Sequence, residues 1–138
     1  MVKCYNSGVE VWNIDESAIV STDARSRGWF WRWETGHITG RILPKRVSLL
    51  AAVSSRGRVM HCALNRTFNS DGFILVFSKM LELLEEEDNN YLDKNIFVLD
   101  NAPYHRSKIA LSYLQSTGAR ICFSAPYSMC LAPAEKLF

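Results

Sequence analysis

Two aspartates of this chain stand where a sheet protein commonly binds its ligands. Asp15 ends the β-branched and aromatic run 9–15, and Asp100 follows the apolar run 96–99. Each run is typical of a strand, and α/β sheets bind ligands at the carboxyl ends of their strands. An aspartate there is also common as a turn or helix-cap residue. Each position alone therefore fits either a binding or catalytic role or a structural one.

Other residue types that carry chemistry form weaker patterns. Glu16 is next to Asp15, but successive strand side chains point to opposite faces, so we do not expect it to be a ligand. The same alternation separates His61 from Cys62 and argues against a zinc site. The four cysteines contain no Cys-x-x-Cys pair, and we interpret them as reduced thiols.

The composition indicates one folded domain. The 138 residues are 48% hydrophobic and 22% charged, which excludes a disordered or fibrous chain. The longest apolar runs fall far short of the roughly 18 residues of a membrane span. The first residues contain no apolar run that would make a secretory signal, so we expect an intracellular protein without a membrane partner.

The first half of the chain predicts strands. We expect strands at residues 9–15 and 17–22, a mostly irregular segment 25–45 with a short strand at 29–33, and a hairpin of strands 47–54 and 58–65 joined by Ser-Ser-Arg-Gly.

The second half predicts helices around a buried strand. A helix of about four turns begins at Ser70 or Asp71 and places an apolar stripe on one face. The run 96–99 suits a strand that is covered on both faces. A helix at 106–115, a strand at 120–124 and a helix that begins near Pro133 follow. The chain therefore predicts an α/β domain with a mixed sheet and helices packed on it.

The blocks around both aspartates resemble a known family. Residues 14–17 (Ile-Asp-Glu-Ser), 100–105 (Asp-Asn-Ala-Pro-Tyr-His) and 125–128 (Ala-Pro-Tyr-Ser) are together similar to the catalytic core of mariner-like transposases of the DDE superfamily. In one branch of that family, the spacing between the second aspartate and a glutamate equals the spacing between Asp100 and Glu135 in this chain. Residues 27–29 (Arg-Gly-Trp) and 48–57 also resemble the family, so the similarity covers nearly the whole chain.

The resemblance implies a ribonuclease H-like fold and a metal-dependent site. Asp15, Asp100 and Glu135 would be the catalytic, metal-binding carboxylates, and such oxygen ligands select Mg²⁺ or Mn²⁺. Two such ions activate a nucleophile and stabilise the leaving oxygen in phosphodiester displacement. Asn101 and His105 would assist the ligands, with a surface helix-cap role as the alternative for His105. Without metal, the like charges should raise the pKa of at least one acid.

The chain departs from the family pattern near its C-terminus. Residues 128–135 read Ser-Met-Cys-Leu-Ala-Pro-Ala-Glu, where the family usually has Ser-Pro-Asp-Leu-Asn-Pro-Ile-Glu. Only Lys136, Leu137 and Phe138 follow Glu135, so we expect a truncated C-terminal helix. We also expect residues 1–138 to form a single catalytic domain without the helix-turn-helix region that family members carry before it.

Basic residues concentrate in one segment, although the net charge of the chain is only +2. Residues 23–46 hold six basic and two acidic side chains, which is a local charge of +4. Phosphate binding needs several cations on one surface. The DNA-contact hypothesis rests on Arg25, Arg27, Arg32, Arg41, Lys45 and Arg46. The alternative is a solvated loop whose Trp29, Trp31 and Trp33 cover the sheet, and we expect these rings in the core rather than stacked on bases.

The resemblance thus implies the catalytic domain of a DNA transposase, which cleaves and joins strands of transposon ends and target DNA. It is compatible with a homodimer in the active assembly and with a nuclear location in a eukaryotic source. One alternative is an inactive or domesticated remnant that acts as a nucleic-acid or protein-binding module. Another is a ribonuclease H-type nuclease acting on RNA–DNA hybrids, which would share the fold and the metals.

Overall fold

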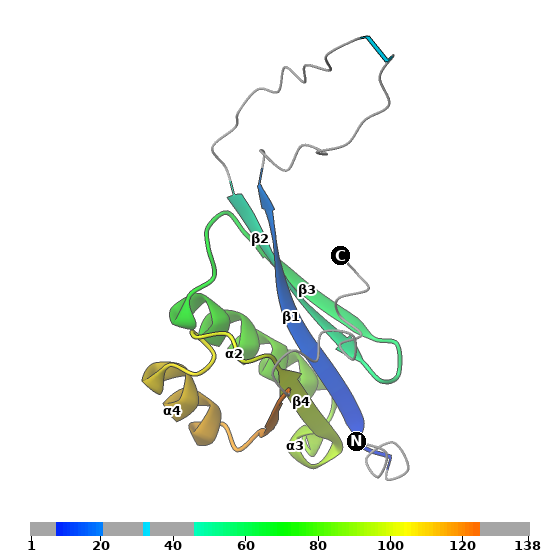
Figure 1. Cartoon of the computed structure of the whole chain (residues 1–138). Helices are drawn as coiled ribbons and strands as arrows, with labels where there is room; N and C mark the ends of the chain where they lie inside the picture. Colours follow the sequence, from blue (N-terminus) through cyan, green and yellow to red (C-terminus); the bar gives the residue numbers. More distant parts are fainter. Residues whose placement is uncertain (1–7, 21–31, 34–45, 125–138) are drawn as a thin grey trace.

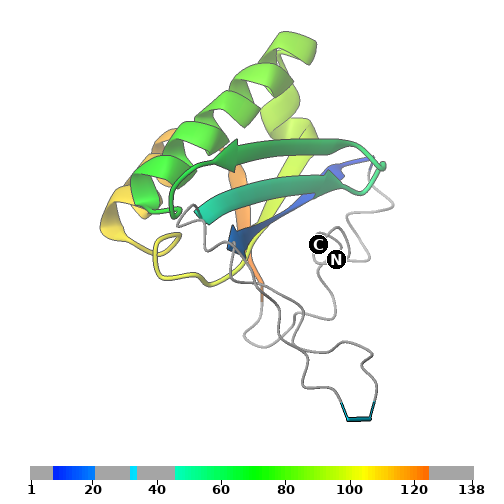
Figure 2. The same cartoon turned by 90° about the horizontal axis from the view of Figure 1, so that it is seen from above.

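The computed structural model describes residues 8–20, 32–33 and 46–124. In this part, five strands form one sheet in the order β3-β2-β1-β4-β5, and α2 and α4 lie on the same face of it (Figures 1 and 2). The elements are β1 (Glu10–Val20), β2 (Arg46–Ser54), β3 (Val59–Leu64), α2 (Ser70–Glu87), α3 (Tyr91–Lys94), β4 (Asn95–Leu99), α4 (Lys108–Ser116) and β5 (Arg120–Phe123). The predicted α/β architecture with a mixed sheet is confirmed.

β1 is one continuous strand in the centre of the sheet. It pairs antiparallel with β2 from Trp12↔Ser54 to Val20↔Arg46. The sequence predicted that the strand ends at Asp15 and that a second one spans 17–22. That prediction is wrong, because pairing with β2 keeps the polar residues 15–17 extended. Residues 21–22 lie outside the described part.

β2 and β3 form the predicted hairpin. Their antiparallel register runs from Ser48↔Leu64 to Val53↔Val59. The turn between them places Gly57 at φ 81°, a left-handed conformation that glycine adopts without a steric penalty. Because β3 pairs with β2 and comes first in the strand order, it lies at one edge of the sheet.

The parallel half of the sheet forms around β4. β4 pairs with β1 from Glu10↔Asn95 to Asn13↔Val98, and with β5 on its other side. Phe97 and Leu99 are fully buried towards the helices, and Val98 is 5% exposed on the opposite face. This burial confirms the prediction of a strand that is covered on both faces.

The main core fills the space between the sheet and α2. Trp12 and Ile14 of β1 pack there with Phe73 and Phe77 of α2, and the rings of Phe77 and Phe97 meet edge to face at 5.2 Å. The indole Nε1 of Trp12 donates a hydrogen bond of 2.8 Å to Asn95 Oδ1. This bond satisfies the polar atom of a side chain that has no exposed surface.

The helices begin close to their predicted starts. α2 has 18 residues and is capped by Asn69, one residue before the predicted Ser70, so it is longer than the expected four turns. α4 is capped by Ser107 and matches the predicted helix at 106–115, while the short α3 was not predicted. No described helix is long and apolar enough to cross a membrane. The predicted strand at 29–33, apart from residues 32–33, and the helix near Pro133 lie outside the described residues.

Candidate active site

The sheet brings the two predicted aspartates to neighbouring strands. β1 and β4 are parallel neighbours, and the last pair of their ladder is Asn13↔Val98. Continued a short way past this pair, the register puts Asp15 beside Asp100. The ladder thus favours the adjacency that the sequence predicted, which stays a prediction, and Asp15 lies within β1 and not at its end.

A fully buried histidine contacts both Asp100 and Glu16. His105 has no exposed surface and follows β4 in the loop before α4. Its Nδ1 lies 2.8 Å from Asp100 Oδ1, and its Nε2 lies 3.0 Å from Glu16 Oε1. The alternative of a surface helix-cap role for His105 is wrong, because Ser107 is the cap of α4 and His105 is fully buried.

Glu16 belongs to this cluster, although strand alternation had excluded it as a ligand. One ligand atom each of Glu16, Asp100 and His105 lies within 4.8 Å of the others, which is a group that could hold a metal ion. Because side chains alternate along a strand, Glu16 and Asp15 point to opposite faces of the sheet. The face to which Glu16 points is the one on which His105 lies. Glu16 therefore lies in the cluster, and the expectation that it is not a metal ligand stays a prediction.

Asp15 lies beside this cluster but is not part of the group within 4.8 Å. Its Oδ1 accepts a hydrogen bond of 2.9 Å from the backbone N–H of Glu16. Its charge, like that of Asp100, acts on the hydroxyl of Tyr104, so both carboxylates lie near that group. Whether Asp15 and Asp100 share a metal stays a prediction.

Electrostatics favour a charged imidazole between the two carboxylates. Burial lowers the pKa of His105, but the hydrogen bonds and charges of Asp100 and Glu16 raise it further, to about 9. Both ring nitrogens can then donate to acceptor oxygens. The His105 hydrogen bond lowers the pKa of Asp100 and outweighs burial, which raises it. The expected mutual repulsion therefore does not raise the pKa of Asp100, because His105 supplies the opposite charge.

Tyr104 completes the cluster and had not been predicted from the sequence. Burial first, then the charge and hydrogen bond of Glu16, raise the pKa of its hydroxyl, which stays neutral. Its ring meets the His105 ring at 4.5 Å. The sequence offered one signal, its place directly before the histidine.

Asn101 braces the loop that carries Asp100. Its Nδ2 donates to the carbonyl of Ser124 at 2.5 Å, and its Oδ1 accepts from Arg106 at 2.7 Å. Because Ser124 directly follows β5, these bonds tie the end of β4 to the end of β5. Asn101 therefore fixes the loop that carries Asp100, and its assisting role at the site stays a prediction.

The remaining predicted residues are placed only in part. Arg32 and Arg46 are exposed, and Trp33 is 81% exposed in a turn, so its predicted core position is wrong. The others, Arg25, Arg27, Trp29, Trp31, Arg41, Lys45 and Glu135, lie outside the described residues.

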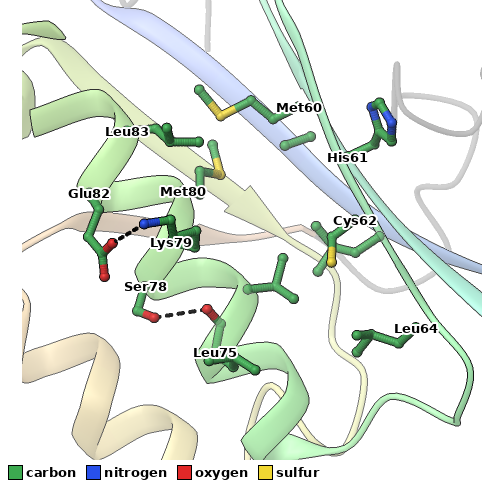
Figure 3. Close-up of a pocket in the computed structure, with 13 residues that line it drawn as sticks. Met60, His61, Cys62, Leu64, Leu75, Ser78, Lys79, Met80, Glu82 and Leu83 are labelled. Atoms are coloured by element: carbon green, nitrogen blue, oxygen red, sulfur yellow. Dashed lines mark hydrogen bonds and ion pairs between the residues drawn. The ribbon is translucent and has the colours of Figure 1, made fainter. Parts of the chain in front are cut away.

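A cavity of about 350 Å³ lies between α2 and the edge strand β3 (Figure 3). Apolar side chains line most of it, among them Met60, Leu64, Met80 and Leu83. None of the clustered acids lines it. This cavity is therefore separate from the cluster of Glu16, Asp100 and His105.

The sequence of residues 10–138 matches the family described as DDE superfamily endonuclease. The chain belongs to this family. The match covers β1 with Asp15 and the loop with Asp100, and it extends over Glu135. Comparison with curated proteins gives no significant match.

Solved structures show that this DDE superfamily member has the ribonuclease H-like fold of a mariner transposase catalytic domain. The Mos1 mariner paired-end complex with Mn has a TM-score of 0.71 and 21% identity over 96% of this chain and 41% of that chain. The catalytic domain of Mos1 mariner transposase has a TM-score of 0.68 and 20% identity over 98% of this chain and 59% of that one. The chain thus spans less than two thirds of the length of either.

Proposed function

We propose that this chain is the catalytic domain of a mariner-like DNA transposase that cleaves and joins DNA strands. The observation that carries the proposal is the parallel register of β1 and β4, which would bring Asp15 beside Asp100 if it continued a short way past its last pair, in a family of endonucleases. Similar folds are found in a Mos1 pre-cleavage transpososome and a Mos1 strand transfer complex. The DNA substrates would be transposon ends and target DNA, the active assembly would be a homodimer, and the protein would act in the nucleus of a eukaryotic source.

The donor atoms fit divalent magnesium or manganese. Asp15 and Asp100 offer carboxylate oxygens, the hard ligands that these ions prefer, and Glu135 would complete the set. Asp100 is half exposed, and the two hydrogen bonds that it makes with other described residues both use Oδ1, so Oδ2 would be the oxygen available to a metal. A Mos1 catalytic domain has been solved with Mg and another with Mn. Two bound ions would activate the attacking hydroxyl and stabilise the leaving oxygen.

The proposal assigns a role to each group of predicted site residues. Asp15 and Asp100 would hold the ions, and these ions would position the reacting phosphate. The hydrogen bond from His105 lowers the pKa of Asp100 and so favours the ionised carboxylate that would bind a metal. Arg25, Arg27, Arg32, Arg41, Lys45 and Arg46 would contact DNA phosphates, which is supported by the exposure of Arg32 and Arg46.

Nicking of a supercoiled plasmid tests the proposal. The wild-type chain should nick the plasmid in Mn²⁺ or Mg²⁺ and not in chelator. Asp15→Asn and Asp100→Asn should each slow nicking by roughly 100-fold or more, because a reacting group displaced by about 1 Å already costs that much. Asp93→Asn, an exposed aspartate of α3, is the matched control and should nick like wild type. Equal nicking by all variants would place the activity elsewhere and contradict the proposal.

A further inference from the structure

The carboxylate of Asp100 is held in one orientation by two hydrogen bonds to the same oxygen. Oδ1 accepts from the backbone N–H of Ala102 at 3.0 Å and lies 2.8 Å from His105 Nδ1. A carboxylate that is fixed through one oxygen turns the other in a defined direction. His105 is therefore one of two groups that aim Oδ2 of Asp100.

The ring of His105 has no room to turn. It has no exposed surface, and it meets Phe73 of α2 edge to face at 4.3 Å and Tyr104 at 4.5 Å. Phe73 is itself fully buried. The orientation of the His105 ring, and with it the direction of Nδ1, is thus set by its packing against Phe73 and Tyr104 and by the partner of Nε2.

That partner is Glu16, which is anchored to the sheet. Glu16 is paired with Leu50 across the β1–β2 ladder, and its side chain is only 10% exposed. The ladder between β1 and β4 ends at Asn13↔Val98, before either acid. Beyond that point, the bridge from Glu16 through His105 to Asp100 links the two strands at the site.

We propose that Glu16 is a positioning residue that acts on Asp100 through His105 and does not itself bind the metal. The bridge holds Oδ1 of Asp100, so the metal meets Oδ2. Outer partners of metal ligands fix ligand orientation in this way, and their loss commonly weakens metal binding roughly 10- to 100-fold. This inference rests on the proposed function, because it assigns Asp100 as a metal ligand.

Two substitutions at Glu16 separate a positioning residue from a ligand. Glu16→Gln keeps an oxygen that accepts from Nε2–H but removes the charged carboxylate that would bind a metal. Glu16→Ala removes both. The affinity of the purified chain for Mn²⁺, measured by calorimetry and by electron paramagnetic resonance, should fall roughly 10- to 100-fold in Glu16→Ala. It should stay near the wild-type value in Glu16→Gln.

Glu10→Gln is the matched control on the same strand. Glu10 is buried and ion-paired with Arg58 at 3.5 Å, near the opposite end of β1. Its substitution should change stability but leave Mn²⁺ affinity unaltered. Circular dichroism checks that each variant folds, and Glu16→Asp, whose shorter side chain withdraws from Nε2, replaces Glu16→Ala if that variant does not fold.

The outcomes are distinct. An equal loss in Glu16→Gln and Glu16→Ala would make Glu16 a ligand and overturn the inference, and unchanged affinity in both would overturn it as well. Spin-echo modulation of Mn²⁺ on the wild-type chain should show no directly bound nitrogen. A bound nitrogen would mean that His105 leaves Asp100 for the metal, which also overturns it. Absence of Mn²⁺ binding to the wild type would refute the proposed function and, with it, the positioning role.

Discussion

A buried imidazole between two acids is costly unless its charge is matched. His105 has no exposed surface, and moving a cation out of water without partners is strongly unfavourable. Glu16 and Asp100 each contact one ring nitrogen, and Phe73 and Tyr104 enclose the ring. Removing one acid would leave a buried charge with an incomplete set of partners. The cluster therefore makes the fold sensitive to pH.

We expect the metal-free protein to lose stability between about pH 6.5 and 9. The pKa of His105 is raised from 6.5 to about 9 by folding, so its contribution is complete below 6.5 and disappears as pH rises through 9. A shift of this size corresponds to about 3 kcal/mol at most. Urea unfolding at pH 6 and pH 9.5 in chelator measures the loss.

His105→Gln is the control for this titration, since glutamine has no proton to lose. Its unfolding free energy should be lower at pH 6 but nearly level from pH 6.5 to 9. Asp100 has the opposite effect at acid pH, because folding lowers its pKa. The stability that its ionised carboxylate contributes is lost as the pH falls below 3.8, the ordinary pKa of an aspartate. An identical alkaline loss in wild type and His105→Gln would show that another group titrates.

The sequence predicted the aspartates of this site better than their partners. Asp15 and Asp100 stood out because each lies beside an apolar run, and the family resemblance of the surrounding residues favoured a site role over a structural one. Glu16 was set aside because alternation gives the face of a side chain but not which loop folds over that face. The burial of His105 depends on Phe73 of α2, which is distant in the sequence, and no local pattern encodes that contact.

At the scale of elements, the start of α2 positions the loop that carries the histidine. The hydroxyl of Ser70 lies 2.8 Å from that of Ser107, the cap of α4, and donates to the carbonyl of Tyr104 at 3.2 Å. Asn69 caps the same turn through a hydrogen bond of 2.9 Å from Gly72 N–H. The two helix starts and the loop between β4 and α4 therefore form one connected unit.

Asn69→Ala should lower the unfolding free energy by about 1 kcal/mol, the usual cost of a lost N-cap. Because the cap also holds the turn beside Tyr104, Mn²⁺ affinity should fall as well, although less than in Glu16→Ala. Urea unfolding and Mn²⁺ titration measure the two effects. Ser78→Ala, which removes a hydroxyl from the middle of α2, is the control and should leave the affinity unchanged.

The limits of prediction at this scale follow from pairing between distant segments. The apolar stripe of α2 was predicted because its period is local, and the structure buries five large apolar residues of the helix, Phe73, Phe77, Met80, Leu81 and Leu84. The break at Asp15 was wrong because β2, a separate segment later in the chain, holds the polar stretch extended. α3 has only four residues, too few for a periodic pattern.

At the scale of the whole molecule, the sheet order makes the site. β4 inserts beside β1 after the β1–β2–β3 meander and α2, which brings together acids from the beginning and the later part of the chain. Neither half of the chain contains both. Metal binding at these acids would therefore stabilise the assembled sheet and not a local segment.

We expect Mn²⁺ to raise the melting temperature of the chain. An ion that binds only the native site adds about 2.7 kcal/mol of stability at 100 times its dissociation constant. For a domain of this size that corresponds to roughly 10 °C. Asp100→Asn should abolish the gain because it removes a ligand next to β4, whereas Asp93→Asn, on neighbouring α3, should retain it. Thermal melts with Mn²⁺ and with chelator measure the difference.

The melting temperatures in chelator report the contribution of Asp100 to the metal-free fold. Asp100→Asn also removes a charged partner of His105, so its melting temperature in chelator should lie below that of the wild type. We therefore expect Asp100→Asn to melt at a lower temperature than the wild type in chelator and to show no rise in melting temperature with Mn²⁺. An equal Mn²⁺ shift in wild type and Asp100→Asn would mean that the ions bind away from Asp15 and Asp100, and the cluster around His105 would then serve the fold alone.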